Sequence, residues 1–353
     1  MSWVQCSDVR FREHETVSAP KENESLTLLT PAPEEKLQSW LREFYGKPIR
    51  ITQRTVLRHR DLSYVERLHV DDGLPESIIY KLVLPPWDIE QDLHERILIP
   101  SVSNSPQLFL SAHFGQLTAL FLEDLGTVIF ESVCTAELAS RLGEELAKLH
   151  RAYGYRTDEL INAGVLRSLL PIDYEDFTGT MVSQLRQWQL VTEKQGQDLQ
   201  TLAQMLARKL ASEPNSLVHG DMYAENIILR GGKMFIIDWS WFTILGVPLM
   251  DVATLTMRHP KNGSFSNWRE ELLDAYCFES GRESEVVRAA LPHAETLSRL
   301  LFLYWLVVRR QLGILGTTVG PVDNLIPRVV DELSERLAGF PSAAFKTSNM
   351  EPW

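Results

Sequence analysis

The sequence predicts an α+β protein of two lobes, in which an antiparallel sheet comes first and a mainly helical part follows. The chain has 353 residues, enough for two domains of roughly 100–200 residues each. Strand signals dominate residues 45–126, and helical periodicity dominates the rest, apart from one strand hairpin within residues 217–239. Strands followed by helices in this order are typical of α+β folds.

Composition and charge are those of an ordinary globular protein. Hydrophobic residues make up 44% of the chain and charged residues 23%. The formal net charge of −12 argues against binding to nucleic acid or to anionic membranes, because both attract cationic surfaces. The longest apolar run, residues 300–308, is shorter than the ~20 residues that span a bilayer. The N-terminus lacks a signal-peptide pattern and the three cysteines are widely separated, so we predict a cytoplasmic protein.

An N-terminal extension and a helix are expected in residues 1–44. The extension is polar and contains proline. From Glu34 to Tyr45, apolar side chains recur at i, i+3, i+4 and i+7, the spacing of a helix with one buried face. Gly46 and Pro48 are typical of the residues that end a helix.

The first lobe, residues 45–126, is predicted to be an antiparallel sheet. Its candidate strands are short apolar runs bounded by turn signals. A helix capped by Asp88 and running to about Leu98 is expected to interrupt the series. The five expected strands are 51–57, 62–70, 78–84, 107–114 and 117–125.

The second lobe, residues 127–340, is predicted to be mostly helical. Leucine stripes at helical spacing are separated there by proline, glycine and polar breaks. Residues 341–353 are expected to form a mobile tail. The expected helices are 135–150, 175–190, 195–210, 268–278, 284–291, 295–312 and 322–337.

Three polar residues, Asp221, Asn226 and Asp238, accompany the hairpin inside the helical lobe. Two apolar runs, 227–229 and 234–237, flank an Arg-Gly-Gly-Lys turn and predict two short strands. We expect the three polar side chains to converge at one end of this hairpin. Two oxygen ligands and a carboxylate base in one place suit a magnesium–nucleotide site.

The same residues carry a family resemblance. His-Gly-Asp at 219–221, Asn226 five residues later, and Ile-Asp-Trp at 237–239 resemble the aminoglycoside phosphotransferase and choline kinase family. That family has the bilobal protein-kinase-like fold. Weaker matches follow the family order: a kinase-lysine strand ending at Lys81, a hinge at 121–126, a Leu-Ala-x-Leu-His helix end at 146–150, and a Gly-x-Pro-x-x-Asp segment at 246–251.

The resemblance implies a phosphoryl-transfer site that uses ATP and Mg²⁺. Asp221 would accept the proton of a substrate hydroxyl or orient that hydroxyl, while Asn226 and Asp238 would hold the metal ion. His219 and Asp251 would support the catalytic loop. Catalysis of this kind rests on positioning and charge neutralisation, which hard oxygen ligands supply.

The resemblance also implies nucleotide contacts in the first lobe. Lys81 would contact the α- and β-phosphates, and Glu95 would hold its ammonium group in place. Glu90, five residues before Glu95, is the rival partner for the lysine. The backbone around Glu123 and Leu125 would meet the adenine.

One departure from the family pattern concerns the loop between the first two strands. Family members often have glycine and small polar residues there, whereas this chain has Arg-His-Arg-Asp-Leu-Ser at 58–63. Ser63 would still offer a hydroxyl and a backbone amide to a phosphate.

We therefore predict an ATP-dependent phosphotransferase that acts on a hydroxyl of a small molecule. Amino alcohols, amino sugars, sugars, nucleosides and antibiotics remain open as acceptors, and so does the oligomeric state. The alternative is a non-catalytic kinase-fold protein with a nucleotide-binding or regulatory role, which the missing glycine-rich loop favours.

Overall fold

The computed structural model describes residues 29–71, 75–317 and 320–340. Most of the expected polar lead-in, part of the turn after residue 71, and the expected mobile tail lie outside these residues. The described chain divides into two compact units. The sheet unit contains the described residues up to 134 together with 223–242, and the helical unit contains 135–222 and the described residues from 243 onward.

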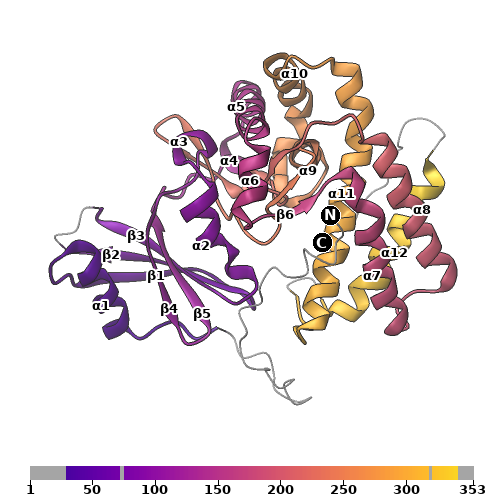
Figure 1. Ribbon diagram of the computed structural model, residues 1–353. Helices are drawn as coiled ribbons and strands as arrows, with labels where there is room; N and C mark the ends of the chain where they lie inside the picture. Colours follow the sequence, from indigo (N-terminus) through magenta and orange to yellow (C-terminus); the bar gives the residue numbers. More distant parts are fainter. Residues whose placement is uncertain (1–28, 72–74, 318–319, 341–353) are drawn as a thin grey trace. The chain divides into compact units, whose positions relative to one another are not determined.

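The sheet unit is built on a five-stranded sheet (Figure 1). Neighbouring strands are antiparallel and follow the order β1-β2-β3-β5-β4. The strands are β1 (Ile51–His59), β2 (Ser63–Val70), β3 (Ser77–Val83), β4 (Leu108–Phe114) and β5 (Leu117–Glu123). The prediction of five antiparallel strands is confirmed, with every strand end within two residues of its expected position.

The predicted helix is present as α1 (Glu34–Tyr45), and its apolar face packs into the core of this sheet. Leu37 and Leu41 are fully buried, and the Trp40 ring meets the edge of Phe121 with ring centroids 5.9 Å apart. The helix ends at Gly46, whose φ of 66° lies in the left-handed region that glycine adopts without steric cost.

The segment between β3 and β4 is less regular than the single helix predicted. A 3-10 turn (Trp87–Ile89) leads into α2 (Glu90–Asp92), a wider π-helical turn (Leu93–Ile97) and then α3 (Pro100–Ser103). The expectation that Asp88 caps the helix is wrong. Its carboxylate instead accepts a hydrogen bond from the Thr118 hydroxyl on β5, at 3.0 Å, because the segment is held against the sheet.

The predicted hairpin consists of β8 (Ile227–Arg230) and β9 (Lys233–Ile236), paired antiparallel around the Gly-Gly turn. Its contacts place it in the sheet unit. Ile228 forms a bridge with Ile129, and the Leu229 amide donates to the Val128 carbonyl at 2.8 Å. These bonds explain why the chain does not divide at a single boundary near Gly126: the segment after β5, which includes α4 (Phe130–Val133), holds the hairpin against the sheet unit.

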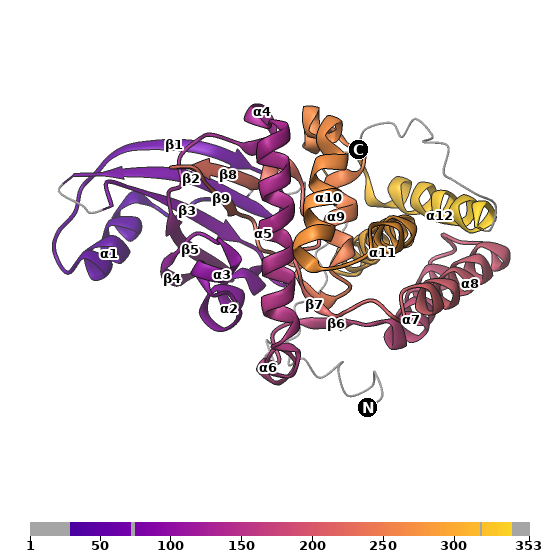
Figure 2. The same cartoon turned by 90° about the horizontal axis from the view of Figure 1, so that it is seen from above.

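The helical unit begins with α5 (Ala136–Gly154), whose first turn is capped by the Thr135 hydroxyl. Two helix pairs run through this unit: α5 packs against α10, and α7 packs against α8 (Figure 2). Helix α12 lies beside both α8 and α11. The other helices are α6 (Thr157–Ala163), α7 (Tyr174–Gln187), α8 (Glu193–Lys209), α9 (Leu249–Thr256), α10 (Arg269–Ser280), α11 (Ser284–Gln311) and α12 (Val322–Gly339).

Helix α11 corrects one prediction. The sequence indicated two helices, 284–291 and 295–312, because Pro292 separates them. The structure has one helix of 28 residues with Pro292 inside it. Leu291, Ala294 and Leu297 are buried on either side of the proline. This continuous apolar face packs in the core and outweighs the loss of one backbone hydrogen bond.

A small sheet that the sequence did not predict joins distant parts of the helical unit. Its strands are β6 (Arg167–Leu169), β10 (Ile244–Gly246) and β7 (Ser216–Val218), in the order β6-β10-β7. Strand β10 pairs parallel with β6 and antiparallel with β7. Because β7 leads directly into His219, this sheet sets the position of the predicted catalytic loop.

Within the described residues, none of the helices combines the length and the apolar character that crossing a membrane would require.

Candidate functional site

In the sheet unit, two cationic side chains, Lys81 and Arg58, converge on Asp238. The Lys81 ammonium on β3 lies 2.6 Å from Asp238 Oδ1 and also pairs with the Glu90 carboxylate of α2. Both terminal nitrogens of Arg58 donate to Asp238 Oδ2 at 3.2 Å. Burial alone would lower the pKa of Lys81, but the Asp238 and Glu90 carboxylates outweigh it and raise that pKa. Lys81 therefore remains a buried cation at neutral pH.

Arg58 reaches this cluster from the end of β1, in the segment where the family pattern has small residues. The β1–β2 register shifts between Val56 and Arg58. Such irregularities change the direction of the side chains around them and occur next to active sites. The sequence motif did not single out Arg58 as a site residue, because its target, Asp238, lies 180 residues away.

The predicted partner of Lys81, Glu95, is wrong, and its rival Glu90 takes that place. Glu90 is buried with its carboxylate against Lys81. Glu95 accepts hydrogen bonds from Gln91 and from Ser111, each at 3.0 Å. The irregular turns of this segment present Glu90, and not Glu95, to the lysine strand.

A pair of variants tests this assignment without any assumption about activity. Glu90→Gln should lower the free energy of unfolding by about 2 kcal/mol, because it weakens a charged hydrogen bond inside the protein. Glu95→Gln should change it by less than about 0.5 kcal/mol, as is usual for an exposed polar substitution. Urea unfolding of both variants measures the difference. Equal effects would contradict the assignment of Glu90.

The ends of the hairpin bring Asn226 and Asp238 close together. The Ile237 amide donates to the Asn226 carbonyl at 2.9 Å, one residue before Asp238. Asn226 is buried, and Asp238 has a φ of 63°, a left-handed conformation that aspartate tolerates better than most residues. The backbone pairing thus places these two residues at the same end of the hairpin, and the convergence of their side chains with that of Asp221 stays a prediction.

This pair of oxygen donors fits Mg²⁺ better than a transition metal. No group of three or more His, Cys, Asp or Glu side chains that could hold a metal occurs among the described residues. Magnesium is usually held by one or two protein oxygens and completes its octahedron with water and substrate phosphates. An amide oxygen and a carboxylate therefore suffice for a site that depends on a bound nucleotide.

Three further predicted nucleotide contacts also lie in the sheet unit. Ser63 is the first residue of β2, and its carbonyl accepts from the Arg60 amide at 2.9 Å across the β1–β2 turn. Glu123 ends β5 and pairs with Arg230 of the hairpin at 2.7 Å. Leu125 is buried just beyond it. The hinge segment is thereby tied to the hairpin that carries Asn226.

In the helical unit, the predicted catalytic loop is held by Asp251. The amides of His219 and Gly220 donate to the two carboxylate oxygens of Asp251, each at 2.8 Å. Gly220 has a φ of 77°, so a side chain at this position would be strained. His219 is buried, and its Nδ1 accepts from the Asp221 amide at 3.3 Å. These bonds determine the direction in which the chain enters Asp221.

Asp251 is itself positioned by residues from two other helices. It stands in the first turn of α9 and is fully buried. His150 of α5 approaches it with Nε2 3.3 Å from Oδ2, while His150 Nδ1 lies 3.1 Å from the Tyr276 hydroxyl of α10. The Leu-Ala-x-Leu-His match in the sequence marked His150, but its two partners emerge only from the packing of these helices.

Asp221 has one cationic neighbour that the sequence did not indicate. The Lys261 ammonium lies 3.6 Å from Asp221 Oδ2, and both side chains are partly exposed. Lys261 follows Asp221 by 40 residues, in the 3-10 segment Pro260–Trp268, and no motif links the two. A positive charge thus lies beside the carboxylate that the sequence predicts as the base.

The support that Asp251 gives to the loop can be measured as stability. Asp251→Asn replaces one acceptor oxygen by an amide group that faces a backbone N–H, which leaves buried donors unsatisfied. We expect the free energy of unfolding to fall by about 2–3 kcal/mol. Asp274→Asn, on an exposed ion pair of the same unit, should cost less than about 1 kcal/mol in the same denaturation experiment. A mild effect of Asp251→Asn would mean that Asp251 does not brace the loop.

Comparisons with known proteins agree on one family. The family model described as "Phosphotransferase enzyme family" matches residues 103–290, more than half of the chain. No curated protein matches the sequence significantly.

Among solved structures, a Plasmodium vivax ethanolamine kinase is 11% identical, with 88% of this chain and 92% of that chain covered and a TM-score of 0.59. The spectinomycin phosphotransferase APH(9)-Ia, in complex with ADP and spectinomycin, is 14% identical, with 88% and 98% covered and a TM-score of 0.51. The gentamicin complex of APH(2")-IIa is also 14% identical, with 88% and 97% covered and a TM-score of 0.53.

At these identities the structural similarities show the fold, and they confirm the predicted α+β, protein-kinase-like class. The family match begins at residue 103, after the lysine strand and Glu90, and covers β4, β5, the predicted catalytic loop and the hairpin. By that match, this chain belongs to the phosphotransferase enzyme family.

Proposed function

We propose that this protein transfers the γ-phosphate of ATP to a hydroxyl group of a small molecule. The observation that carries the proposal is the cluster in the sheet unit, where buried Lys81 bridges Glu90 and Asp238. A lysine braced by a glutamate, beside a carboxylate and an amide at a hairpin end, is the arrangement that neutralises nucleotide phosphates in kinases.

The proposed nucleotide contacts all lie in the sheet unit. Lys81 would bind the α- and β-phosphates, and the backbone around Glu123 and Leu125 would meet the adenine. Asn226 and Asp238 would hold Mg²⁺, which supplies charge neutralisation at the phosphates when bound. Solved structures of similar fold contain ADP, which supports a nucleotide in this unit.

The transfer itself needs little covalent chemistry from the protein. The acceptor oxygen would form a bond to the γ-phosphorus as the bond between that phosphorus and the β–γ bridging oxygen of ATP breaks, and ADP leaves. Asp221 would take the hydroxyl proton or orient the hydroxyl for attack, while His219 and Asp251 hold the loop in position. This division of roles matches a reaction whose rate depends on positioning.

The family indicates a small-molecule acceptor but does not identify the compound. The similar structures include an ethanolamine kinase and phosphotransferases complexed with spectinomycin or gentamicin, all of them proteins with small-molecule acceptors. The sequence has no Asp-Phe-Gly and Ala-Pro-Glu pair bounding an activation loop, which protein kinases use. A small molecule is therefore favoured over a protein as acceptor.

A thermal-shift experiment tests nucleotide binding directly. ATP with Mg²⁺ should raise the Tm by several degrees, because a ligand at 100 times its Kd adds about 2.7 kcal/mol of stability. ATP with EDTA should raise it much less, and Mg²⁺ alone should have little effect. A protein whose Tm responds to no nucleotide would be better described as a non-catalytic binding module.

A further inference from the structure

The helical unit contains a pocket that the proposed roles above do not use. Strand β6 supplies one wall of it, and helices α7 and α11 supply the other. The residues that line it are Arg167, Ser168, Leu169, Phe177, Ile244, Leu301 and Tyr304. The pocket thus combines one cation with two aromatic rings and several aliphatic groups.

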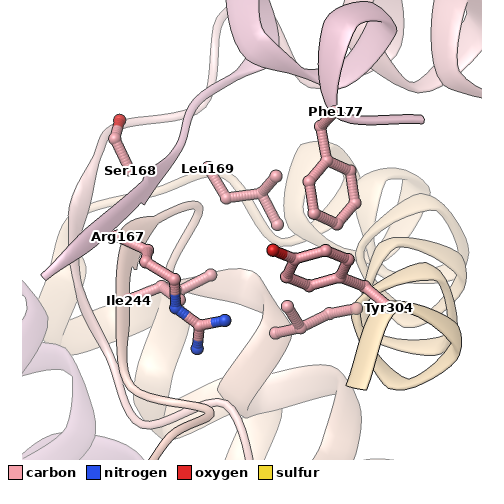
Figure 3. A pocket seen from close by; sticks show the side chains of 7 residues that line it. Arg167, Ser168, Leu169, Phe177, Ile244 and Tyr304 are labelled. Atoms are coloured by element: carbon pink, nitrogen blue, oxygen red, sulfur yellow. The ribbon is translucent and has the colours of Figure 1, made fainter. Parts of the chain in front are cut away.

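The strand pleat sorts the side chains of β6 between two faces. In Figure 3, Arg167 and Leu169 project toward the aromatic side chains, and Ser168 projects the other way. The Ser168 hydroxyl donates to Asp173, at 3.2 Å, and the same carboxylate accepts from the Leu170 amide. The Asp173 carboxylate is thus engaged at the start of α7, on the Ser168 side of the strand.

Arg167 brings a partly buried positive charge to this pocket. Burial lowers the pKa of its guanidinium to about 10, an effect that Tyr304 opposes. The group is still protonated at neutral pH, in surroundings of low polarity. A guanidinium there presents a planar set of donors that matches a carboxylate or a phosphate group. Phe177 of α7 and Tyr304 of α11 stand in contact with each other beside it, with ring centroids 4.8 Å apart (Figure 3).

Sheet register connects the pocket to the catalytic loop. Ile244 of β10 pairs with Arg167 on one side and with Val218 on the other. Val218 lies three residues before Asp221 in the chain. Two strand spacings, roughly 10 Å, therefore separate the backbone of Arg167 from the strand that ends in the catalytic loop. Lys261 adds a second cation at Asp221 itself.

We propose that the Arg167 pocket is the part of the acceptor site that binds an oxyanion, so that the acceptor is a small molecule with both a hydroxyl and a carboxylate or phosphate group. The inference rests on the proposed phosphotransferase function and names its acceptor class. The cavity volume is about 20 Å³, close to the space that one or two water-sized groups need, which suits a single anionic group better than a whole sugar ring. Arg167 and Lys261 would both repel a cationic acceptor.

The first experiment measures anion binding without turnover. The full-length protein is saturated with ADP and Mg²⁺, so that its nucleotide site is filled, and then titrated with benzoate, phenyl phosphate or benzamide while its Tm is recorded. Benzoate, phenyl phosphate or both should raise the Tm, and neutral benzamide should not. The two oxyanions distinguish a carboxylate site from a phosphate site.

Substitutions then locate the bound anion. Arg167→Met should weaken binding of the anion by about 10- to 100-fold, the effect of losing charged hydrogen bonds. Arg167→Lys keeps the charge but loses the planar fork of the guanidinium. Its affinity for the anion should therefore lie between those of the wild type and Arg167→Met. Arg208→Met, an exposed site on α8, makes the same change in net charge and should bind like the wild type. Arg167→Met that binds the anion normally would overturn the proposal.

The second experiment uses the wild-type chain alone and so does not depend on whether a variant folds. ADP release is compared across hydroxylated compounds grouped as anionic, neutral and cationic. The proposal requires turnover to concentrate in the anionic group, and preference for ethanolamine or kanamycin would overturn it. A Tm that responds to Mg–ATP in a protein that binds neither anion refutes only the oxyanion site. A protein that fails to bind nucleotide refutes the proposed function itself.

Discussion

Asp221→Asn should lower kcat by about 10²- to 10⁴-fold, the usual contribution of a positioned acid–base group. Asparagine has nearly the same shape as aspartate but cannot accept the hydroxyl proton as a base. The loop backbone should stay in place, because its bonds to Asp251 come from the His219 and Gly220 amides. The Kd of ADP should therefore change by less than about threefold, because Asp221 has no proposed contact with the nucleotide.

This prediction needs an equally conservative control. Asp176→Asn removes a carboxylate from the exposed face of α7 in the same unit and should leave kcat unchanged. The value of kcat is measured as ADP release, with the acceptor found among the anionic, neutral and cationic hydroxylated compounds. Calorimetry provides the Kd of ADP. If Asp221→Asn turned over as fast as Asp176→Asn, Asp221 would have neither the base nor the orienting role.

Asp238→Asn should abolish the effect of Mg²⁺ on nucleotide binding and lower kcat by about 10³-fold. The carboxylate is the anionic member of the Asn226–Asp238 pair, and losing several kcal/mol of transition-state charge stabilisation corresponds to a change of this size. The measurement is the Tm of the variant with ATP, in Mg²⁺ and in EDTA. The wild type should show a clear difference between the two conditions, and the variant should show little.

Arg58→Ala removes an ion pair of Asp238 but leaves the proposed metal ligand, the Asp238 carboxylate, in place. Arg58 and a metal ion would compete for the same oxygen, Asp238 Oδ2, which Arg58 contacts at 3.2 Å in this structure. Removing Arg58 should therefore preserve the Mg²⁺ effect that Asp238→Asn abolishes. An Asp238→Asn protein that keeps the full difference between Mg²⁺ and EDTA would exclude Asp238 as a metal ligand.

The choice between Glu90 and Glu95 shows where sequence reasoning ends. The two glutamates are five residues apart, which puts them about 140° apart around an ideal helix. Either could therefore face Lys81, depending on the rotation of the helix about its axis. In the structure, a short α-helical turn is followed by a π-helical turn. Glu90 is buried there, whereas Glu95 accepts hydrogen bonds from Gln91 and Ser111.

Arg58, Lys261 and Arg167 show the same limit for long-range contacts. Each lies outside the motifs, and each acquires its significance from a residue far away in the chain. Arg58 meets Asp238, Lys261 meets Asp221, and Arg167 is brought level with Val218 by a three-stranded sheet of three-residue strands. Strands so short carry almost no periodic signal, and their pairing depends on contacts that only the folded chain makes.

The sequence by itself determined the local elements and predicted the chemistry proposed for the β8–β9 hairpin. Strand alternation, helical spacing and turn residues act over a few positions, so β1 to β5, α1 and the β8–β9 hairpin could be predicted closely. The fixed spacing of Asp221, Asn226 and Asp238 likewise identified the family. Tertiary structure alone decided that Glu90 braces Lys81, that α11 continues through Pro292, and that a guanidinium lies in a pocket beside the sheet leading to Asp221. These outcomes depend on burial and charge pairing between segments distant in sequence, where a few kcal/mol of packing outweigh local preference.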